Sequence, residues 1–270
     1  MRPTMSSKHW ASRHPTITCL VQRHQPVAQR QRARVAAVVF DLGRVLLDFD
    51  FARSAARLSQ ACQAPVPTKQ EVLLELFGHS PLPTGMLDRW GGCSLVEQME
   101  RGLLSSEQFH EAVVEASGLQ LDFATFAQLY ADIFSPVQLM IQQQQLLRSS
   151  GVPTYLLSNC SALHIDDVRE RYPFFSTFNG LCLSYLERSF KPEPEIYAAT
   201  ERLTGLSGAD LVFIDDRADN AAAAGARGWQ AIHHTSPEAT LLQLQQLGLP
   251  VVAAGAAVAD DPGASSDTRL

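Results

Sequence analysis

The chain has 270 residues, 46% of them hydrophobic, and a formal net charge of −6. This length is enough for a full α/β core and a second small module, and no apolar run approaches the roughly 18 residues of a membrane span, so we expect no membrane partner. The five cysteines, Cys19, Cys62, Cys93, Cys160 and Cys182, form no C-x-x-C pair and are odd in number, which argues against a zinc knuckle and a disulfide framework and is typical of a reducing compartment.

Residues 1–34 form a basic stretch without any acidic residue. Its seven cationic side chains are Arg2, Lys8, Arg13, Arg23, Arg30, Arg32 and Arg34, and they leave a net charge of about −13 for the rest of the chain. Such a stretch is typical of an organelle transit peptide, chloroplast in preference to mitochondrion; the alternative is a basic disordered tail on a cytoplasmic protein. The acidic body has no basic patch, so we expect no nucleic-acid partner.

The first predicted strand is the apolar run Val35–Phe40. Its length and β-branched residues fit a strand that is buried on both faces of a parallel sheet. Asp41 ends the run, and Gly43 follows in a tight loop. A carboxylate at the carboxyl end of a buried strand lies where open α/β sheets hold their ligands. The alternative is an ordinary polar turn after the strand.

Residues 51–133 change to a helical pattern. Apolar residues spaced at three and four predict helices over Phe51–Ser59, Gln70–Phe77, Ser105–Val114 and Asp122–Tyr130. Ser105 together with Gln108 forms a capping box that marks a helix start. Because this stretch carries no strand signal, we expect a helical module that is inserted after the first strand and lies over the carboxyl edge of the sheet.

Strands and helices alternate again after residue 134. The predicted strands are Val152–Leu157, Leu181–Tyr185, Leu211–Ile214 and Gln230–His233, and the predicted helices are Val137–Arg148, Ala162–Tyr172, one that ends at Leu203, and Asn220–Arg227. This alternation predicts an α/β fold with a parallel sheet. We therefore divide the chain into a disordered segment 1–34, a core of 35–50 plus 134–250, a helical insert 51–133 and a disordered tail 251–270.

Polar residues follow the predicted strands at their carboxyl ends, namely Asp41, Ser158, Asn159, Asp215 and Asp216. Carboxylates that converge on one edge repel each other unless a cation joins them, and hard oxygen ligands without His or Cys select Mg²⁺. Lys191 can neutralise a carboxylate and a phosphate together. Taken singly, these residues have ordinary explanations as a helix cap, a surface turn or partners of a helix dipole.

In combination they resemble a family, the haloacid dehalogenase superfamily of aspartate-nucleophile phosphohydrolases, over about residues 35–249. The four motifs are Asp41-Leu-Gly-Arg-Val, Ser158-Asn159, Lys191-Pro-Glu-Pro-Glu-Ile-Tyr and Phe213-Ile-Asp-Asp-Arg-Ala-Asp-Asn220. The resemblance implies a doubly wound, Rossmann-like core with an inserted four-helix cap. It is closest to bacterial α-D-glucose-1-phosphate phosphatase-like members, which share Asp-Leu-Gly in the first motif and Asp-Asp-x-Ala-Asp-Asn in the last.

The resemblance also implies roles for these residues. Asp41 is the nucleophile and a ligand of the Mg²⁺ cofactor, the Gly43 carbonyl is a second ligand, Asp216 ligates directly and Asp215 directly or through water. Lys191 holds Asp41 and the phosphate in register. Ser158 and Asn159 bind the transferring phosphoryl group, and Arg44 is a further candidate for contact with the substrate.

One position departs from the family pattern. Most phosphatases of this superfamily carry a second Asp two residues after the nucleophile, which acts as general acid and base, and here that residue is Gly43. Loss of a general acid typically removes about 10²–10⁴ in rate. We therefore expect slow turnover and a leaving group that needs little protonation, such as that of a sugar 1-phosphate.

The predicted function is thus Mg²⁺-dependent hydrolysis of a small phosphomonoester, with a sugar phosphate such as glucose 1-phosphate favoured. The alternatives are a nucleotide or FMN phosphatase of the same superfamily, a phosphate-binding or regulatory protein with weakened turnover, and a dehalogenase, against which both Gly43 and the Asp215–Asp216 pair argue. The expected partner is a small phosphorylated metabolite, and the expected state is a monomer or weak homodimer.

Overall fold

The computed structural model describes residues 35–61, 73 and 94–253. The predicted transit peptide at 1–34, and with it the predicted location in an organelle, lies outside the described residues, as does residue 254 onward of the predicted tail. The predicted helix Gln70–Phe77 lies outside them too, except for Leu73, which is helical and fully buried.

The core is a five-stranded parallel sheet with strand order β5-β4-β1-β6-β7. The strands are β1 (Ala37–Phe40), β4 (Thr154–Ser158), β5 (Gly180–Leu183), β6 (Leu211–Asp215) and β7 (Gln230–His233). All four residues of β1 are fully buried, as expected for a central strand that is covered on both faces. The predicted parallel α/β fold is therefore confirmed.

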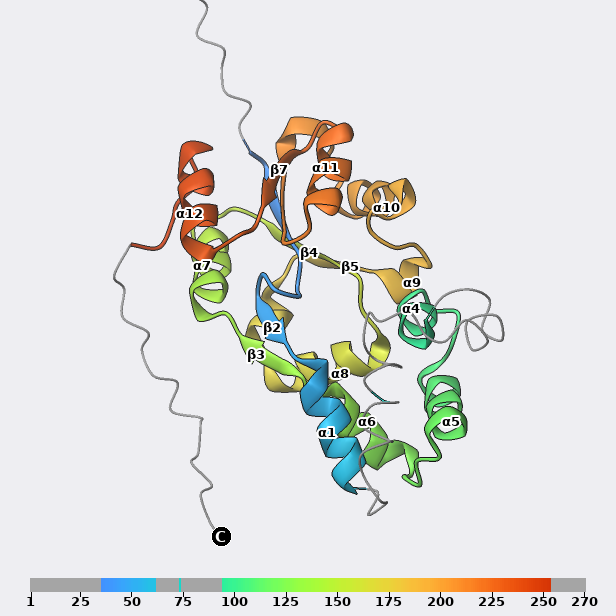
Figure 1. Cartoon of the computed structure of the whole chain (residues 1–270). Coiled ribbons are helices and arrows are strands. Elements are labelled where there is room, and N and C mark those ends of the chain that lie inside the picture. Colours follow the sequence, from blue (N-terminus) through green and yellow to red (C-terminus); the bar gives the residue numbers. More distant parts are fainter. Residues whose placement is uncertain (1–34, 62–72, 74–93, 254–270) are drawn as a thin grey trace, which may run out of the picture. The chain divides into compact units, whose positions relative to one another are not determined.

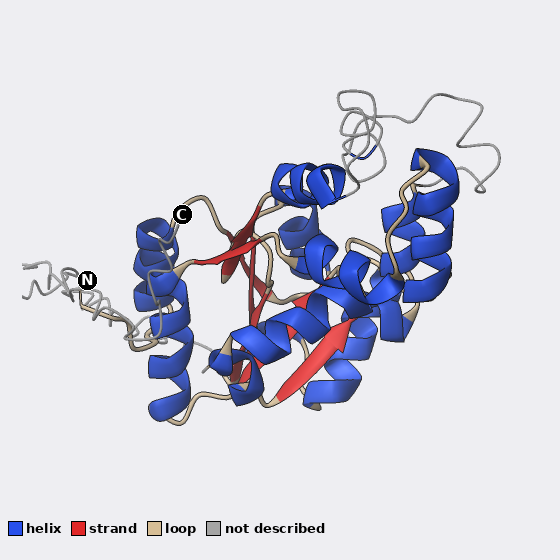
Figure 2. Cartoon of the chain, turned by 90° about the horizontal axis from the view of Figure 1, so that it is seen from below, coloured by secondary structure: helices blue, strands red, loops and turns tan. Residues whose placement is uncertain are grey.

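Helices cover both faces of this sheet (Figure 2). On one face, Val38 and Phe40 of β1 share a core with α7 (Gln138–Ser149), α8 (Ala162–Arg171) and α12 (Pro237–Gln246). On the other face, Ala37 and Val39 share a core with α10 (Pro194–Thr204) and α11 (Ala218–Ala226). Because side chains alternate along a strand, one short apolar run supplies both cores.

Several elements differ from the sequence predictions. Ser184 and Tyr185, predicted as strand, begin the short helix α9 (Ser184–Glu187), and α12 was not predicted. Its N-cap Ser236, whose side chain accepts from the Ala239 N–H, and the following Pro237 are its start signals. Two short 3-10 helices, η1 (Pro173–Thr177) and η2 (Gly208–Asp210), complete the connections.

A two-stranded antiparallel sheet, also not predicted, joins the core to the helical insert. Strand β2 (Leu47–Phe49) pairs with β3 (Phe134–Pro136), with Asp48 opposite Ser135. Strands of three residues are too short to show a hydrophobic period, and their pairing is non-local in sequence. This pair brings the two ends of the insert together beside the site.

The described part of the insert consists of α1 (Phe51–Ala61), α4 (Leu95–Glu100), α5 (Ser106–Ser117) and α6 (Phe123–Ala131) (Figure 1). The predicted capping box is confirmed, since Ser105 accepts from the Gln108 N–H and Gln108 accepts from the Ser105 N–H. The insert has its own apolar core, built mainly from Leu58, Leu95, Phe109, Val113, Phe126 and Tyr130. It therefore packs largely independently of the sheet.

Among the described residues, no helix combines the length and apolar character that crossing a membrane requires. Cys160 and Cys182 are both buried free thiols.

Candidate active site

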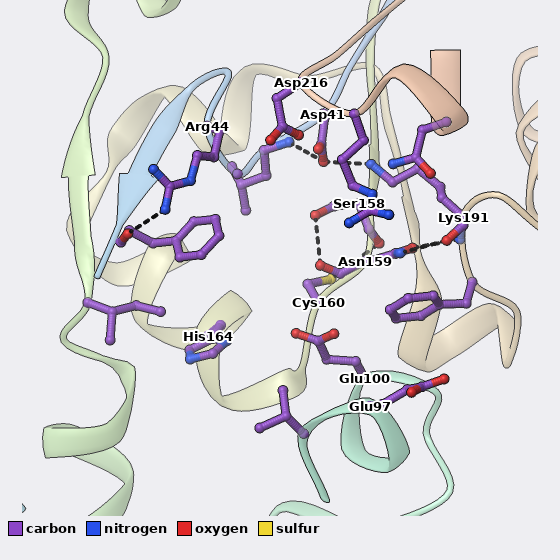
Figure 3. Close-up of a pocket in the computed structure, with 18 of the residues that line it drawn as sticks. Asp41, Arg44, Glu97, Glu100, Ser158, Asn159, Cys160, His164, Lys191 and Asp216 are labelled. Atoms are coloured by element: carbon purple, nitrogen blue, oxygen red, sulfur yellow. Dashed lines mark hydrogen bonds and ion pairs between the residues drawn. The ribbon is translucent and has the colours of Figure 1, made fainter. Parts of the chain in front are cut away.

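The candidate site lies at the carboxyl edge of the sheet, where three neighbouring strands end. Asp41 directly follows β1, Ser158 is the last residue of β4, and Asp215 is the last residue of β6, with Asp216 next to it. Because β1 lies between β4 and β6 and is parallel to both, the sheet brings these side chains together. Figure 3 shows three of them, Asp41, Ser158 and Asp216, at one end of the pocket. The predicted convergence of the strand-end residues is therefore present.

Lys191 lies at the centre of this group, with only 3% of its surface exposed. Its Nζ atom is 2.8 Å from Asp41 Oδ1, 2.7 Å from Asp215 Oδ2 and 3.1 Å from the Leu157 carbonyl oxygen. These three acceptors use all three donors of the ammonium group. Burial acts to lower the pKa of Lys191, but the charges of Asp215 and Asp41 outweigh it, so the pKa is raised. The side chain is therefore a permanent cation that joins two buried carboxylates.

Asp41 has one carboxylate oxygen held and the other available. Its Oδ1 accepts from Lys191 and from the Leu42 N–H at 2.7 Å, while no hydrogen bond to Oδ2 occurs within the described chain. Burial raises the pKa of Asp41, Lys191 opposes this effect, and the charge of Asp215 adds to it. An ionised Asp41 thus depends on positive charge close by.

Asp215 and Asp216 have different surroundings. Asp215 is fully buried, and beside Lys191 it accepts from the Arg217 N–H and from Asn220 Nδ2, each at 2.9 Å. Asp216 is half-buried, and burial followed by the charge of Asp215 raises its pKa. Asp216 is therefore the more accessible of the two, and its role as the direct ligand stays a prediction.

The three carboxylates form a set that fits a divalent cation. One oxygen each from Asp41, Asp215 and Asp216 lies within 4.8 Å of the others. Three anionic groups face a single ammonium, so a further positive charge would relieve their repulsion. Hard oxygen donors of this kind suit Mg²⁺. The Gly43 carbonyl belongs to the same loop, and its predicted part in metal binding stays a prediction.

The second motif contributes a hydroxyl and a positioning amide. Ser158 is buried, and its hydroxyl lies 3.4 Å from the Asn159 carbonyl oxygen. Asn159 uses both ends of its side chain on the backbone of Lys191, donating to its carbonyl at 3.1 Å and accepting from its N–H at 2.8 Å. In this structure the Asn159 side chain therefore orients the Lys191 loop, and the predicted phosphate contacts of Ser158 and Asn159 stay predictions.

The aromatic ring of Phe49 packs beside both Gly43 and Arg44. A Cβ atom at position 43 would lie 2.9 Å from Phe49 Cε1, so the ring occupies the space that a side chain there would need. The Arg44 guanidinium lies over the same ring, 4.7 Å from its centroid, and pairs with Asp48 at 3.2 Å. Arg44 therefore borders the pocket but points toward β2 (Figure 3), and its predicted contact with substrate stays a prediction.

A pocket of about 600 Å³ opens over these residues. Asp41, Ser158, Lys191 and Asp216 line its polar end, and aromatic rings of Phe49, Phe51, Phe134 and Phe190 line its walls. The insert contributes Ser94, Val96, Glu97 and Glu100 from α4 and its N-cap. A substrate with its phosphate at the sheet edge would thus place its leaving group against the insert.

Sequence reasoning did not assign roles to three residues around the site, Asn220, Ser184 and Glu100. Asn220 is the last residue of the fourth motif, and its position in that motif was the available signal. Ser184 accepts from the Cys160 N–H at 2.9 Å next to the second motif. Glu100 lies on a six-residue helix between glycines, which is too short for a periodic signal.

Comparisons with known proteins agree with the four motifs. The model of the haloacid dehalogenase-like hydrolase family matches residues 35–228. A sesquiterpene phosphatase of Aspergillus oryzae is 31% identical over 153 residues, which is 56% of this chain and 78% of that protein. A D-ribitol-5-phosphate phosphatase of Bacteroides thetaiotaomicron is 23% identical over 189 residues, or 68% of this chain and 84% of that protein.

A solved structure has the same fold. It is a HAD family enzyme of Bacteroides thetaiotaomicron in complex with magnesium and inorganic phosphate, with a TM-score of 0.61 and 23% sequence identity. The similarity covers 73% of this chain and 93% of that chain. At this level of identity the likeness supports the fold alone.

Proposed function

Since the chain belongs to the haloacid dehalogenase-like hydrolase family, we propose that it is a Mg²⁺-dependent phosphatase of small phosphomonoesters that works through an aspartyl-phosphate on Asp41. The general assignment as a phosphatase follows from the family and from two curated relatives that are both phosphatases. The Mg²⁺ dependence and the aspartyl-phosphate on Asp41 are supported by one observation. Lys191 contacts the buried Asp41 carboxylate at 2.8 Å, and the carboxylates of Asp215 and Asp216 lie beside it.

In the first step, Asp41 Oδ2 bonds to phosphorus as the bond between phosphorus and the leaving alcohol oxygen breaks, while Oδ1 stays bound to Lys191 and the Leu42 N–H. Lys191 lowers the pKa of Asp41 against the larger, raising effect of burial. The Ser158 hydroxyl and backbone N–H groups of its loop hold phosphoryl oxygens. In the second step, water attacks the phosphorus of the aspartyl-phosphate and releases phosphate and the free Asp41 carboxylate. The pocket limits access of bulk water during both steps.

Asp41, Asp216 and the Gly43 carbonyl would hold Mg²⁺, with Asp215 contributing directly or through water. When bound, the ion supplies positive charge that polarises phosphoryl oxygens and offsets the three carboxylates.

For the alcohol part of the substrate, a phosphorylated sugar such as glucose 1-phosphate is the first candidate. Ser94, Glu97 and Glu100 at the insert side of the pocket offer groups that can bind sugar hydroxyls. A nucleotide or FMN would find aromatic walls for its ring system in the same pocket. One relative is named as a D-ribitol-5-phosphate phosphatase. D-ribitol 5-phosphate is a phosphorylated polyol, which is chemically similar to a sugar phosphate.

A second candidate is the phosphate ester of a hydrocarbon alcohol. The rings of Phe49, Phe51 and Phe134, with Ile133 and Val96, make one side of the pocket apolar, and apolar walls bind apolar leaving groups by the hydrophobic effect. The relative named as a sesquiterpene phosphatase acts on a substrate of this kind.

Phosphate release from a panel of sugar, nucleotide and prenyl phosphates, with Mg²⁺ and with chelator, tests the proposal. We expect release that needs Mg²⁺, that is lost in Asp41→Asn and that is kept in the matched surface variant Asp48→Asn. Halide release from 2-haloacids without metal would instead support the dehalogenase alternative. Phosphate binding without turnover of any ester would support the regulatory alternative.

We also propose a partner, an oligomeric state and a location for the enzyme. We propose that its partner is a small phosphorylated metabolite, that it is a monomer or weak homodimer, and that it resides in an organelle, with the chloroplast favoured. Size-exclusion chromatography with light scattering and a fluorescent fusion of the full chain test these points.

A further inference from the structure

The proposed reaction needs a side chain that donates a proton in the first step and accepts one in the second, and none has been assigned so far. An alkoxide leaving group needs a proton, and the water that attacks the aspartyl-phosphate must lose one. No side chain at Gly43 can do either, and the Phe49 ring fills the space beside it. If the chain turns over alkyl phosphates, another group must carry this proton.

Two acidic residues near the first motif can be set aside. Asp48 is exposed, pairs with Arg44 at 3.2 Å and accepts from the Phe49 N–H. Asp50 is exposed as well and accepts from the Ala52 N–H at 2.9 Å at the start of α1. Neither side chain lines the pocket, so neither can reach a leaving oxygen.

Three other titratable side chains of the pocket, Glu97, His164 and Cys160, are unsuited to give a proton to the leaving oxygen and take one from water. Glu97 pairs with Arg101 at 2.9 Å. Burial lowers the pKa of His164 to about 3, so its ring is neutral and has no acidic proton to give near neutral pH. Burial raises the pKa of the Cys160 thiol far above neutrality.

Glu100 differs from all of these. Its side chain lines the same pocket as Asp41, and among the described residues its carboxyl group has no hydrogen bond or ion pair. In Figure 3 the carboxyl group points toward Cys160 and the second motif, whereas that of Glu97 points away from them. Burial and the charge of Glu97 raise the pKa of Glu100 to about 7, against the opposing effect of Lys191, so near neutral pH it can both donate and accept a proton.

The C-terminal end of α4, which carries Glu100, is held beside the carboxyl edge of the sheet by contacts of three consecutive residues, Glu100, Arg101 and Gly102. Ser184 Oγ donates to the Glu100 carbonyl at 2.6 Å and accepts from the Cys160 N–H at 2.9 Å. Arg101 pairs with Glu193 at 2.6 Å, two residues after Lys191. The next residue, Gly102, packs so closely against the Tyr185 carbonyl that a Cβ atom would collide with it. Glu100 is thus held at a defined place beside the second and third motifs.

We propose that Glu100 is the general acid and base of this enzyme, in place of the residue absent at position 43; this rests on the proposed phosphatase function. As Asp41 forms its bond to phosphorus and the bond to the leaving oxygen breaks, the Glu100 carboxylic acid gives its proton to that oxygen, and the alcohol leaves. The Glu100 carboxylate then takes a proton from water as the water oxygen bonds to phosphorus and the Asp41–phosphorus bond breaks. Phosphate leaves, and Glu100 is again protonated.

The test compares leaving groups in the full-length protein with Mg²⁺. Hexyl phosphate has a leaving oxygen that needs a proton, whereas p-nitrophenyl phosphate has one that departs as an anion. In Glu100→Gln we expect kcat/KM for hexyl phosphate to fall about 10²–10⁴-fold, and the first nitrophenol turnover to fall less than about 10-fold. Because the base is also lost, nitrophenol should appear as a burst of one equivalent, with phosphorylated Asp41 accumulating in the mass spectrum.

Three further variants make the result specific. Glu100→Asp keeps an acid and should recover part of the hexyl phosphate activity, Glu111→Gln on the exposed face of α5 should match the wild type, and Asp41→Asn should be inactive on both esters. Circular dichroism and melting curves check that each variant is folded.

The pH profile of the wild type supplies another readout. The rate on hexyl phosphate should fall as pH rises through about 7, where Glu100 loses its proton, and this limb should be absent in Glu100→Gln. The titratable groups that face Glu100 are Glu97 on its own helix, Tyr130 on α6, Cys160 and His164 after β4, and Asp41 and Lys191 at the sheet edge.

The outcomes separate the two proposals. Turnover that needs Asp41 but stays within about threefold of wild type in Glu100→Gln would overturn the role of Glu100 alone. Equal losses on both esters without a burst would do the same, because they indicate a structural role. No phosphate release by the wild type would remove the proposed function, and the role of Glu100 with it.

Discussion

Replacement of Lys191 by methionine gives a direct test of the electrostatic centre of the site. The side chain is nearly the same length, so the change removes the ammonium and leaves Asp41 and Asp215 facing each other without their shared cation. Asp215 keeps its contacts with the Arg217 N–H and Asn220, whereas Asp41 keeps only the Leu42 N–H.

The size of the effect follows from these contacts. Each charge pair at 2.7–2.8 Å has an attraction of about 6 kcal/mol at an effective dielectric constant of about 20. Much of this is offset by the desolvation of the ammonium and the carboxylates. Removal of one partner from a buried ion pair destabilises proteins by about 3–5 kcal/mol. That is a large part of a typical unfolding free energy of about 5–15 kcal/mol.

The loss should depend on pH. In the folded wild type, burial raises the pKa of Asp41 above the value of 3.8 for the free side chain, and removal of Lys191 raises it further. A carboxyl group with a raised folded pKa contributes stability that is present below its unfolded pKa and lost as pH rises through the folded pKa. The deficit of Lys191→Met relative to wild type should therefore be largest above pH 8 and smallest in acid.

The assay is equilibrium urea unfolding of metal-free protein at about pH 5.5 and 8.5, followed by circular dichroism. The control is the double variant Lys191→Met/Asp215→Asn, which removes one of the uncompensated charges and should recover part of the stability. A Lys191→Met protein whose unfolding free energy stays within about 1 kcal/mol of wild type at both pH values would refute the reasoning.

Two further predictions concern the metal and the first loop. Mg²⁺ at about 100 times its Kd should raise the unfolding free energy by about 2.7 kcal/mol; Asp216→Asn should lose this shift in a melting assay, and an unchanged shift would place the ion elsewhere. Gly43→Asp should destabilise the protein by about 1–3 kcal/mol because the new Cβ meets the Phe49 ring. The added variant Phe49→Ala should relieve that clash, so that Gly43→Asp costs less in this background; an equal loss in both backgrounds, measured by urea unfolding, would contradict the steric explanation.

The sequence by itself determined the sheet and most of the catalytic edge. The run before Asp41 is apolar at every position that β1 uses, and Val38 and Val39 are β-branched, so its burial on both faces could be predicted from local sequence. Alternation of strands and helices implied parallel strands, and parallel strands present their carboxyl ends at one edge. Hence the sequence alone predicts that Asp41, Ser158, Asp215 and Asp216 lie together.

The tertiary structure alone decided which partner each side chain meets. Nothing local to Asn159 indicates that its amide holds the Lys191 backbone, and nothing local to Gly43 indicates that Phe49 fills the space beside it. The β2–β3 pair joins segments separated by the whole insert. Glu100 lines the pocket at the end of α4, which contacts Ser184 and Glu193 from distant parts of the chain. Hydrophobic periodicity reports which face of an element is buried, whereas such contacts depend on the position of elements distant in sequence, which only the assembled chain determines.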